Sequence, residues 1–502
     1  MNARISCKAL ACTALFLTLV ACGNMNDRLE RMIPADATGA ISIDVPQLVD
    51  KAGIRKDDRI VIPAELESIL DANDRSRLCQ IITDLPVSGI NTDCRAFVYF
   101  SGKTFNTVAL VALDDPDAMR TLLSRRTGAD FATVENVDCI YRGDYLYAID
   151  GKVLLAGHVA RSIDQKKAAR AARSILDHNA RSLLDDKQAR QCLHADQAIN
   201  AYLQLKGLKT LLRKSDAYKE IAQRMPLLEI FTESDIESVD AHVTLDDTQA
   251  TLNAAINAQP NSEYVQLLNA TLSKPADVTL KAIPNSMDYI VSMSVNGQNF
   301  VKLQQLQQLI DIFKKLPYIG RIDLASILAT IDGPFTVGMA RDPHLEGEWN
   351  VVVAARTNNA DTILQQISSF ANSMGQAPEL YDNEYIYQYE NKMIKMGMID
   401  DVLYLKMLDY EQTEGYASEM TRLNKFFASA PIAIYGHTRN DSTNCYIDFG
   451  LTDNVTGIGH FYTDRAGANV TLELLKSLCS VKPDNDYDTA EDDMEQLIGL
   501  DN

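Results

Sequence analysis

The chain has 502 residues, 46% of them hydrophobic, and carries a formal net charge of −20. This length suggests two or three domains, and the apolar share is ample for buried cores. A body this acidic repels nucleic acid and anionic lipid headgroups, so we expect neither as a partner.

The N-terminus has the successive features of a bacterial lipoprotein precursor. Arg4 and Lys8 precede an apolar segment, Ala9–Ala21, which is shorter than the roughly 20 apolar residues that a spanning helix needs. Leu19–Cys22 then matches a lipobox, in which the cysteine thiol is acylated and the peptide bond before it is cut.

We therefore predict a signal peptide at residues 1–21, a lipid on Cys22 and a lipid-anchored tether at 22–31. One acyl chain anchors a protein only marginally, whereas two or three hold it firmly. Asp27 and Glu30 follow closely behind Cys22, but no Asp follows it directly. We expect an outer-membrane lipoprotein of the cell envelope, on the periplasmic face or the cell surface. An ordinary cleaved signal with a chance cysteine is the alternative.

Six of the nine cysteines remain beyond the predicted signal and Cys22. An exported compartment permits disulfides, but the spacings are wide and no CxxC motif occurs. We expect mostly buried free thiols, with Cys79–Cys94 as the best candidate for a bridge. The six are Cys79, Cys94, Cys139, Cys192, Cys445 and Cys479.

An internal repeat organises the predicted elements. Segments 33–54 and 283–306 both read as Ile-Pro, a short polar link, an alternating strand, a turn and a helix. Further pairs follow in the same order along the chain. They are the strands Thr107–Ala112 and Asn350–Ala355, the helix starts at Asp115 and Asn359, the segments Tyr141–Tyr147 and Tyr381–Tyr387, and the turns Asp150–Gly151 and Asp400–Asp401.

Two homologous repeat domains are predicted from this order, at residues 32–275 and 276–480. The first has an additional helix around 161–191, and its late hairpin at 236–257 has a counterpart within 432–463. Strands of period 2 alternate with helices of period 3.6. The pattern favours an α+β fold of largely antiparallel sheets with packed helices.

The C-terminal segment, residues 481–502, is predicted to be a disordered acidic tail. Five acids between Asp484 and Glu495 have the spacing of a calcium loop, which suits a hard cation. Thr489, however, stands where that loop requires a glycine turn, so we favour a solvated tail.

Three alternating tyrosines, Tyr385, Tyr387 and Tyr389, share one face of a predicted strand. An exposed aromatic face of this kind is a candidate binding platform for a sugar or a protein. A half-buried strand is the alternative, because tyrosine favours strands in any case. Trp349, the only tryptophan, is interpreted as a core residue.

No catalytic, cofactor or metal motif is recognisable. The seven histidines form neither HxH nor HExxH, and no GxSxG occurs. The paired carboxylates at 114–115, 246–247 and 400–401 fall at predicted turns, where aspartate suits the backbone. We predict no catalytic residue, no cofactor and no metal.

The lipobox, the I-P-x-D-A motif at Ile33, the helix ending in Lys51-Ala52-Gly53 and the weaker second copy resemble a family of Bacteroidetes lipoproteins, the domain of unknown function 4836. The resemblance covers the chain from Ile33 to about Lys482. It implies export, an envelope setting and a two-part fold. It implies no activity and no functional residues.

Taken together, the sequence predicts a non-catalytic envelope lipoprotein that binds a protein or glycan partner, or is structural, and meets the membrane through its lipid. The alternative is a hydrolase-type enzyme with a site between the two repeats. Convergent carboxylates or histidines there would favour the enzyme. A third interpretation, a lipid-carrying shell, requires a large apolar cavity.

Overall fold

The computed structural model describes residues 25–480 with internal gaps, so the predicted signal peptide, Cys22 and the tail at 481–502 lie outside the described residues. The gaps are 58, 65, 67–76, 102, 161–162, 178–180, 206–234, 260, 285, 304–305, 308–309, 312–322, 342–348, 374–378, 382–383, 390–391, 409–416, 441–442, 454 and 466. Within the described part, every helix is too short or too polar to cross a bilayer.

The N-terminal half, residues 25–257, forms an antiparallel series of strands in the order β6-β7-β8-β9-β5-β4-β1-β10-β11-β12. The strands are β1 (Gly39–Asp44), β4 (Arg95–Phe100), β5 (Phe105–Ala112), β6 (Ala132–Val134), β7 (Val137–Arg142), β8 (Tyr145–Asp150), β9 (Val153–Val159), β10 (Ile199–Gln204), β11 (Ser238–Leu245) and β12 (Gln249–Asn257). A small hairpin joins β2 (Arg55–Lys56) and β3 (Arg59–Ile60). The helices are α2 (Val45–Lys51), α4 (Arg77–Asp84), η1 (Leu85–Val87), α5 (Pro116–Thr127), α6 (Gln165–Leu176), η2 (Leu183–Asp185) and α7 (Lys187–Leu193).

The C-terminal half, residues 261–480, forms a second antiparallel series in the order β16-β17-β18-β19-β15-β14-β13-β20-β21-β22. The strands are β13 (Tyr289–Asn296), β14 (Ile331–Arg341), β15 (Trp349–Thr357), β16 (Glu379–Tyr381), β17 (Glu384–Tyr389), β18 (Lys392–Ile399), β19 (Val402–Leu408), β20 (Ile432–Asn440), β21 (Thr443–Leu451) and β22 (Thr456–Thr463). The helices are α11 (Glu263–Thr271), η3 (Val278–Ala282), α12 (Gly297–Phe300), α14 (Leu324–Ala329), α15 (Ala360–Ser373), α16 (Ala417–Phe427) and α17 (Val470–Ser480).

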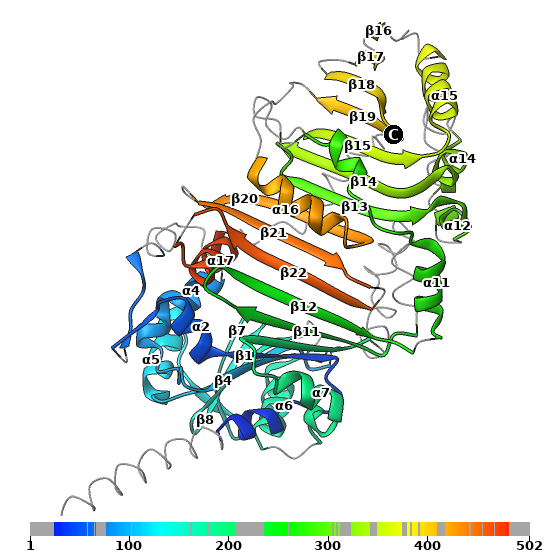
Figure 1. Ribbon diagram of the computed structural model, residues 1–502. Coiled ribbons are helices and arrows are strands. Elements are labelled where there is room, and N and C mark those ends of the chain that lie inside the picture. Colours follow the sequence, from blue (N-terminus) through cyan, green and yellow to red (C-terminus); the bar gives the residue numbers. More distant parts are fainter. Residues whose placement is uncertain are drawn as a thin grey trace, which may run out of the picture.

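The two series meet at β12 and β22. These strands pair antiparallel, with Gln249 opposite Tyr462 and Ala255 opposite Thr456. Apart from the β2–β3 hairpin, the described strands therefore form one 20-stranded sheet, which runs in Figure 1 from the N-terminal half at lower left to the C-terminal half at upper right. Its strand order reads the same from either edge, and the α+β prediction is confirmed.

Local sequence explains several element boundaries. The Asp115 carboxylate accepts hydrogen bonds of 3.0 Å from the amides of Asp117 and Ala118, and Pro116 opens the helix, so α5 begins where predicted. The predicted turns at Gly151 and Asp400 both connect paired strands, with φ values of 56° and 55°. Asp400 thus takes the backbone conformation that glycine supplies in the other half.

One predicted correspondence is wrong. Tyr141–Tyr147 spans the turn between β7 and β8, whereas Tyr381–Tyr387 spans the turn between β16 and β17. In the strand order, β16 and β17 stand where β6 and β7 do, so the match is displaced by one strand. Tyrosines recur in these strands because they suit half-buried positions, and this recurrence made unrelated hairpins look alike.

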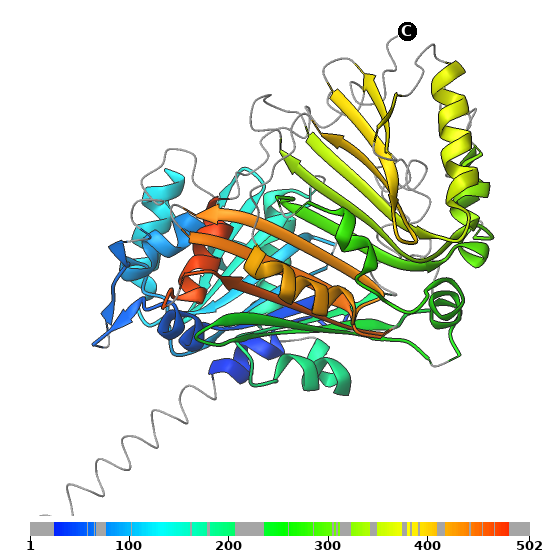
Figure 2. The ribbon, with the colours of Figure 1, turned by 45° about the horizontal axis from the view of Figure 1, so that its top comes forward.

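The sheet has a core face that carries the largest apolar clusters. In the N-terminal half, helical residues 25–31, α6 and α7 cover this face and bury Phe97, Tyr99 and Tyr202. In the C-terminal half, η3 and α16 cover it and bury Tyr435 and Tyr446. Figure 2 shows α16 lying along β20–β22.

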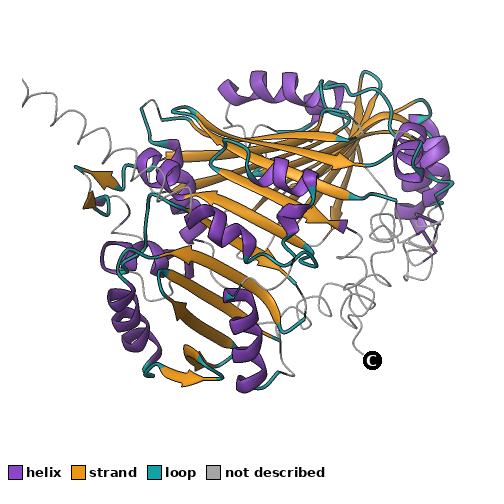
Figure 3. Ribbon diagram, turned by 90° about the horizontal axis from the view of Figure 1, so that it is seen from below, coloured by secondary structure: helices purple, strands orange, loops and turns teal. Residues whose placement is uncertain are grey.

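We call the opposite side the open face, because helices cover it only in part. At one end α5 packs on Ile149 and Leu154, and at the other α12 and α14 pack near Val295. The last helix, α17, packs on Phe461 and also reaches α2 and α4 of the N-terminal half. Figure 3 shows from below how the helices flank the strands.

Two of the six predicted thiols are settled directly. Cys139 and Cys192 are buried free cysteines. Burial raises the pKa of the Cys192 thiol to about 12, and the thiol donates to the Ala201 carbonyl oxygen at 3.2 Å, so it is a protonated packing group rather than a nucleophile. The side chain of Cys79 lies outside the described residues, and the Cys79–Cys94 bridge stays a prediction.

Candidate functional site

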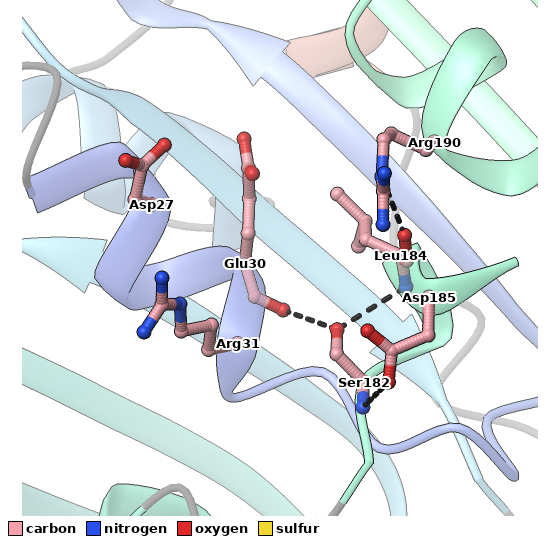
Figure 4. Close-up of a pocket in the computed structure, with 7 residues that line it drawn as sticks. All are labelled: Asp27, Glu30, Arg31, Ser182, Leu184, Asp185 and Arg190. Carbon is pink, nitrogen blue, oxygen red and sulfur yellow. Dashed lines mark hydrogen bonds between the residues drawn. The ribbon is translucent and has the colours of Figure 1, made fainter. Parts of the chain in front are cut away.

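A polar cavity of about 480 Å³ lies where helical residues 25–31 meet the segment formed by η2 and α7 (Figure 4). Its walls are mostly charged, and acids and arginines face one another across it. The lining residues are Asp27, Glu30, Arg31, Ser182, Leu184, Asp185 and Arg190.

Hydrogen bonds around Ser182 hold the N-terminal helix to this segment. The Ser182 hydroxyl donates to the carbonyl oxygen of Glu30 at 2.8 Å and accepts from the amide of Leu184 at 3.2 Å. The Asp185 carboxylate accepts from the Ser182 amide at 3.1 Å, which completes a capping box. Arg190 donates to the Leu184 carbonyl at 2.7 Å. Because the Ser182 proton is committed to a backbone carbonyl, no base activates this hydroxyl.

Glu30 adds a charged contact to the same joint. Its carboxylate lies 2.8 Å from His194 Nε2, and burial raises the pKa of Glu30 despite this hydrogen bond. Leu29 beside it is fully buried, and Arg28 pairs with Asp150 at 3.0 Å. The predicted tether at 22–31 is therefore a packed helix from Met25 onward, and the cavity belongs to its docking site.

The predicted tyrosine platform is only partly consistent with the structure. Tyr387 is 5% exposed, and its hydroxyl lies 3.2 Å from Ser368 Oγ on α15. The prediction is wrong at Tyr387, because α15 covers this side of β17. Tyr385 is half-buried, and the Tyr389 side chain lies outside the described residues.

Exposed apolar side chains gather instead on the open face of the C-terminal half. We define the open-face patch as five residues on four strands. They are Tyr289 (39% exposed), Val291 (38%), Trp349 (37%), Ile434 (44%) and Ile447 (56%). The core interpretation of Trp349 is therefore wrong. Contiguous exposed apolar surface of this kind marks binding sites in soluble proteins.

The strand register makes the patch continuous. Val291 pairs with Ile434, and Gly436 stands between Tyr289 on one side and Ile447 on the other. A Cβ on Gly436 would lie 3.0 Å from Ile447 and 3.5 Å from Tyr289, so both side chains lean over this glycine. The Tyr289 and Trp349 ring centres are 6.1 Å apart. The sequence shows alternation in these strands but does not reveal which face the helices leave open.

A buried acid and histidine lie near the junction of the two halves. Asp448 is 1% exposed, and its Oδ1 lies 2.6 Å from His460 Nδ1. Burial raises the pKa of Asp448. From α16, Arg422 lies 3.4 Å above the Tyr462 ring, and Phe426 meets His460 edge-on. Phe426 thus covers one side of the imidazole, and the His460 side chain stays 18% exposed, whereas Asp448 is buried.

The other candidates from the sequence have structural roles. Asp115 caps α5, Asp247 pairs with Lys51, and Asp401 pairs with Arg356. Within the described residues, no group of three or more histidine, cysteine or acidic side chains is arranged to hold a metal ion.

Comparisons with known proteins add little. No family model and no curated protein matches the chain. Among solved structures, crystal form III of TP0453 has 11% identity and a TM-score of 0.31, over 48% of this chain and 84% of that chain. Crystal form I of TP0453 has 12% identity and a TM-score of 0.28, over 48% and 83%. Likenesses this weak carry no argument, and the family resemblance stays a prediction.

Proposed function

We propose that the chain is a lipoprotein of the bacterial cell envelope, held at the outer membrane by acyl chains on Cys22. The observation that carries this proposal is the lipobox, Leu19–Cys22, behind a basic start and a short apolar segment. The helical residues from Met25 support a close attachment, because Met25 already packs against the core only three residues after Cys22. At up to about 3.5 Å per residue, three residues reach at most about 10 Å, so the body would lie against the membrane surface.

Metabolic labelling with an alkyne-tagged palmitate tests the anchor. The natural chain should be labelled and should sediment with membranes, whereas Cys22→Ala should be unlabelled. Cys12→Ala is the matched control, because this cysteine precedes the predicted cleavage point and its loss should leave labelling unchanged. Equal labelling of the Cys22→Ala variant would refute the anchor.

For the body we propose binding rather than catalysis. The open-face patch supports this role, because it is an accessible surface without a covering helix among the described residues. The polar cavity supports it less, since its hydrogen bonds serve to dock the N-terminal helix.

A hydrolase with a site between the halves is the second candidate. The observation in its favour is the Asp448–His460 pair, which lies beside β12 at the junction, with Thr251 opposite His460. Chromogenic ester and glycoside substrates test this candidate. Turnover by the natural chain that is lost in both Asp448→Asn and His460→Gln would favour the enzyme over the binding protein.

We also propose that the halves are two homologous repeats, with domains at 32–275 and 276–480. The support is the strand order, in which each strand of one half has a counterpart at the same place in the other. The β12–β22 pairing fits this proposal, since the last strand of each repeat would form the junction.

A further inference from the structure

We propose that the open-face patch binds an acyl chain of a lipid, which gives the proposed binding function its ligand class and rests on it. The contact surface is hydrocarbon apart from the tyrosine hydroxyl and the indole N–H at one edge. Such a surface recognises a ligand by dispersion and by release of water rather than by hydrogen bonds.

The backbone beneath the patch is already paired on both sides. β13 lies between β14 and β20, β20 lies between β13 and β21, and β21 lies between β20 and β22. An extended peptide therefore finds no free strand edge here, and binding of a peptide by strand addition is excluded at this patch. A ligand meets side chains only.

The patch has the length of one acyl chain. Four strand spacings separate β21, which carries Ile447, from β15, which carries Trp349. At about 4.8 Å per spacing this is about 19 Å. One leaflet of a bilayer provides about 15 Å of hydrocarbon, so a chain from that leaflet fits along the patch.

One edge of the patch offers a place for a polar lipid end. The Arg341 guanidinium lies 5.8 Å from the Trp349 ring centre, opposite it in the strand register. Among the described residues the Arg341 guanidinium has no ion-pair partner. The nearby Asp288 carboxylate instead contacts the backbone N–H of Arg341 and the His437 imidazole. A guanidinium suits a carboxylate or a phosphate. It supplies locally the cation that the acidic body as a whole does not.

Charge and chemistry argue against a protein in this position. A second copy carries the same net charge of −20 and is repelled. Protein interfaces also form about one hydrogen bond per 100–200 Å², and the centre of this patch offers no side-chain donor or acceptor. A lipid chain requires none there.

Site-specific photo-crosslinking in the full-length chain tests the proposal. Ile447→p-benzoylphenylalanine is expressed in cells fed alkyne-tagged palmitate, with Ile81→p-benzoylphenylalanine as the matched control. Ile81 is an isoleucine of nearly equal exposure, 57% against 56%, on α4 rather than on the patch. Trypsin places the two positions on peptides 440–465 and 78–95, apart from Cys22.

We expect a tagged lipid adduct on peptide 440–465 only after irradiation, and none above the unirradiated level on peptide 78–95. Equal adducts at both positions, or an adduct to a second copy or another protein at position 447, would overturn the proposal. Ile434→p-benzoylphenylalanine must give a tagged lipid adduct on its own peptide, 426–439, which guards against local misfolding at Ile447. Labelling at Cys22 occurs without irradiation, so failure of the anchor is distinguished from failure of the patch.

Discussion

The two halves share one order of strands but present different surfaces on the open face. β1 begins with Gly39 where β13 begins with Tyr289, and β5 begins with Phe105 where β15 begins with Trp349. Phe105 is 3% exposed, whereas Trp349 is 37% exposed. Equivalent places in the sheet order therefore give a packed surface in one half and an accessible aromatic surface in the other.

A one-residue irregularity explains the difference between the two aromatic residues. The pairing of β5 with β9 shifts between Phe105 and Thr107, whereas Trp349 stays in regular register with Arg341. Because side chains alternate between faces, an extra residue moves the next side chain to the other face. Phe105 thus turns into the core cluster beside Val159, and Trp349 stays on the open face. Strand order alone does not decide where a binding surface lies.

The largest expected effect is a difference in stability between a core substitution and a substitution in the open-face patch. Leu146 on β8 is fully buried in the core of the N-terminal half. We expect Leu146→Ala to lower the free energy of unfolding by about 2–5 kcal/mol, because it leaves a cavity. Ile447→Ala should change it by no more than about 0.5 kcal/mol, since its side chain is already in contact with water. Urea denaturation measures both values, and similar losses would contradict the assignment of the patch as surface.

A smaller effect should appear where the halves contact each other through α17. Leu472 packs with Val49, Ile54 and Ile82 of the N-terminal half. We expect Leu472→Ala to cost about 2 kcal/mol, as for a buried leucine at the edge of a core. Calorimetry should then show two transitions, because the unfolding temperatures of the two halves become different. A single sharp transition at the natural midpoint would show that α17 contributes nothing to their coupling.

The pH dependence of stability should distinguish the buried acid of the C-terminal half. Burial raises the pKa of Asp448 above its ordinary 3.8, against the opposing effects of His460 and Arg422. A raised folded-state pKa gives stability that is full below pH 3.8 and is lost as the pH rises through the folded pKa.

Asp448→Asn removes this loss, so the variant should gain stability relative to the natural chain as the pH rises from acid to neutral. Melting temperatures across that range measure the difference. A constant difference between the two proteins would contradict the raised pKa.

The sequence was sufficient for the elements that depend on local chemistry. Asp115 predicted the start of α5, Gly151 and Asp400 predicted hairpin turns, and the late hairpin at 236–257 is β11–β12. Its expected counterpart at 432–463 contains three strands, β20 to β22.

Long-range pairing and surface exposure could not be predicted in the same way. Nothing in β12 and β22 alone indicates that Asn253 lies opposite Ile458 and joins the halves. The open-face patch depends on which faces the helices cover. Tyr387 and Trp349 show that the sequence of a strand does not by itself determine whether its aromatic residues are exposed. In each case the deciding contact is far away in the sequence.

The smallest predicted effect concerns Trp349, which is exposed where its counterpart Phe105 is buried. Trp349 is the only tryptophan, so tryptophan emission, excited at a wavelength that tyrosine does not absorb, reports on the patch alone. Adding palmitate should shift its emission to shorter wavelength, because the indole loses water. Arg341→Gln removes the cation that would pair with the palmitate carboxylate, an exposed ion pair of about 0.5–1 kcal/mol, and should raise the Kd for palmitate roughly two- to fivefold. Arg356→Gln, which breaks the ion pair with Asp401, should leave the titration unchanged. An equal loss in both variants would mean that general charge, not the guanidinium at the edge of the patch, governs binding.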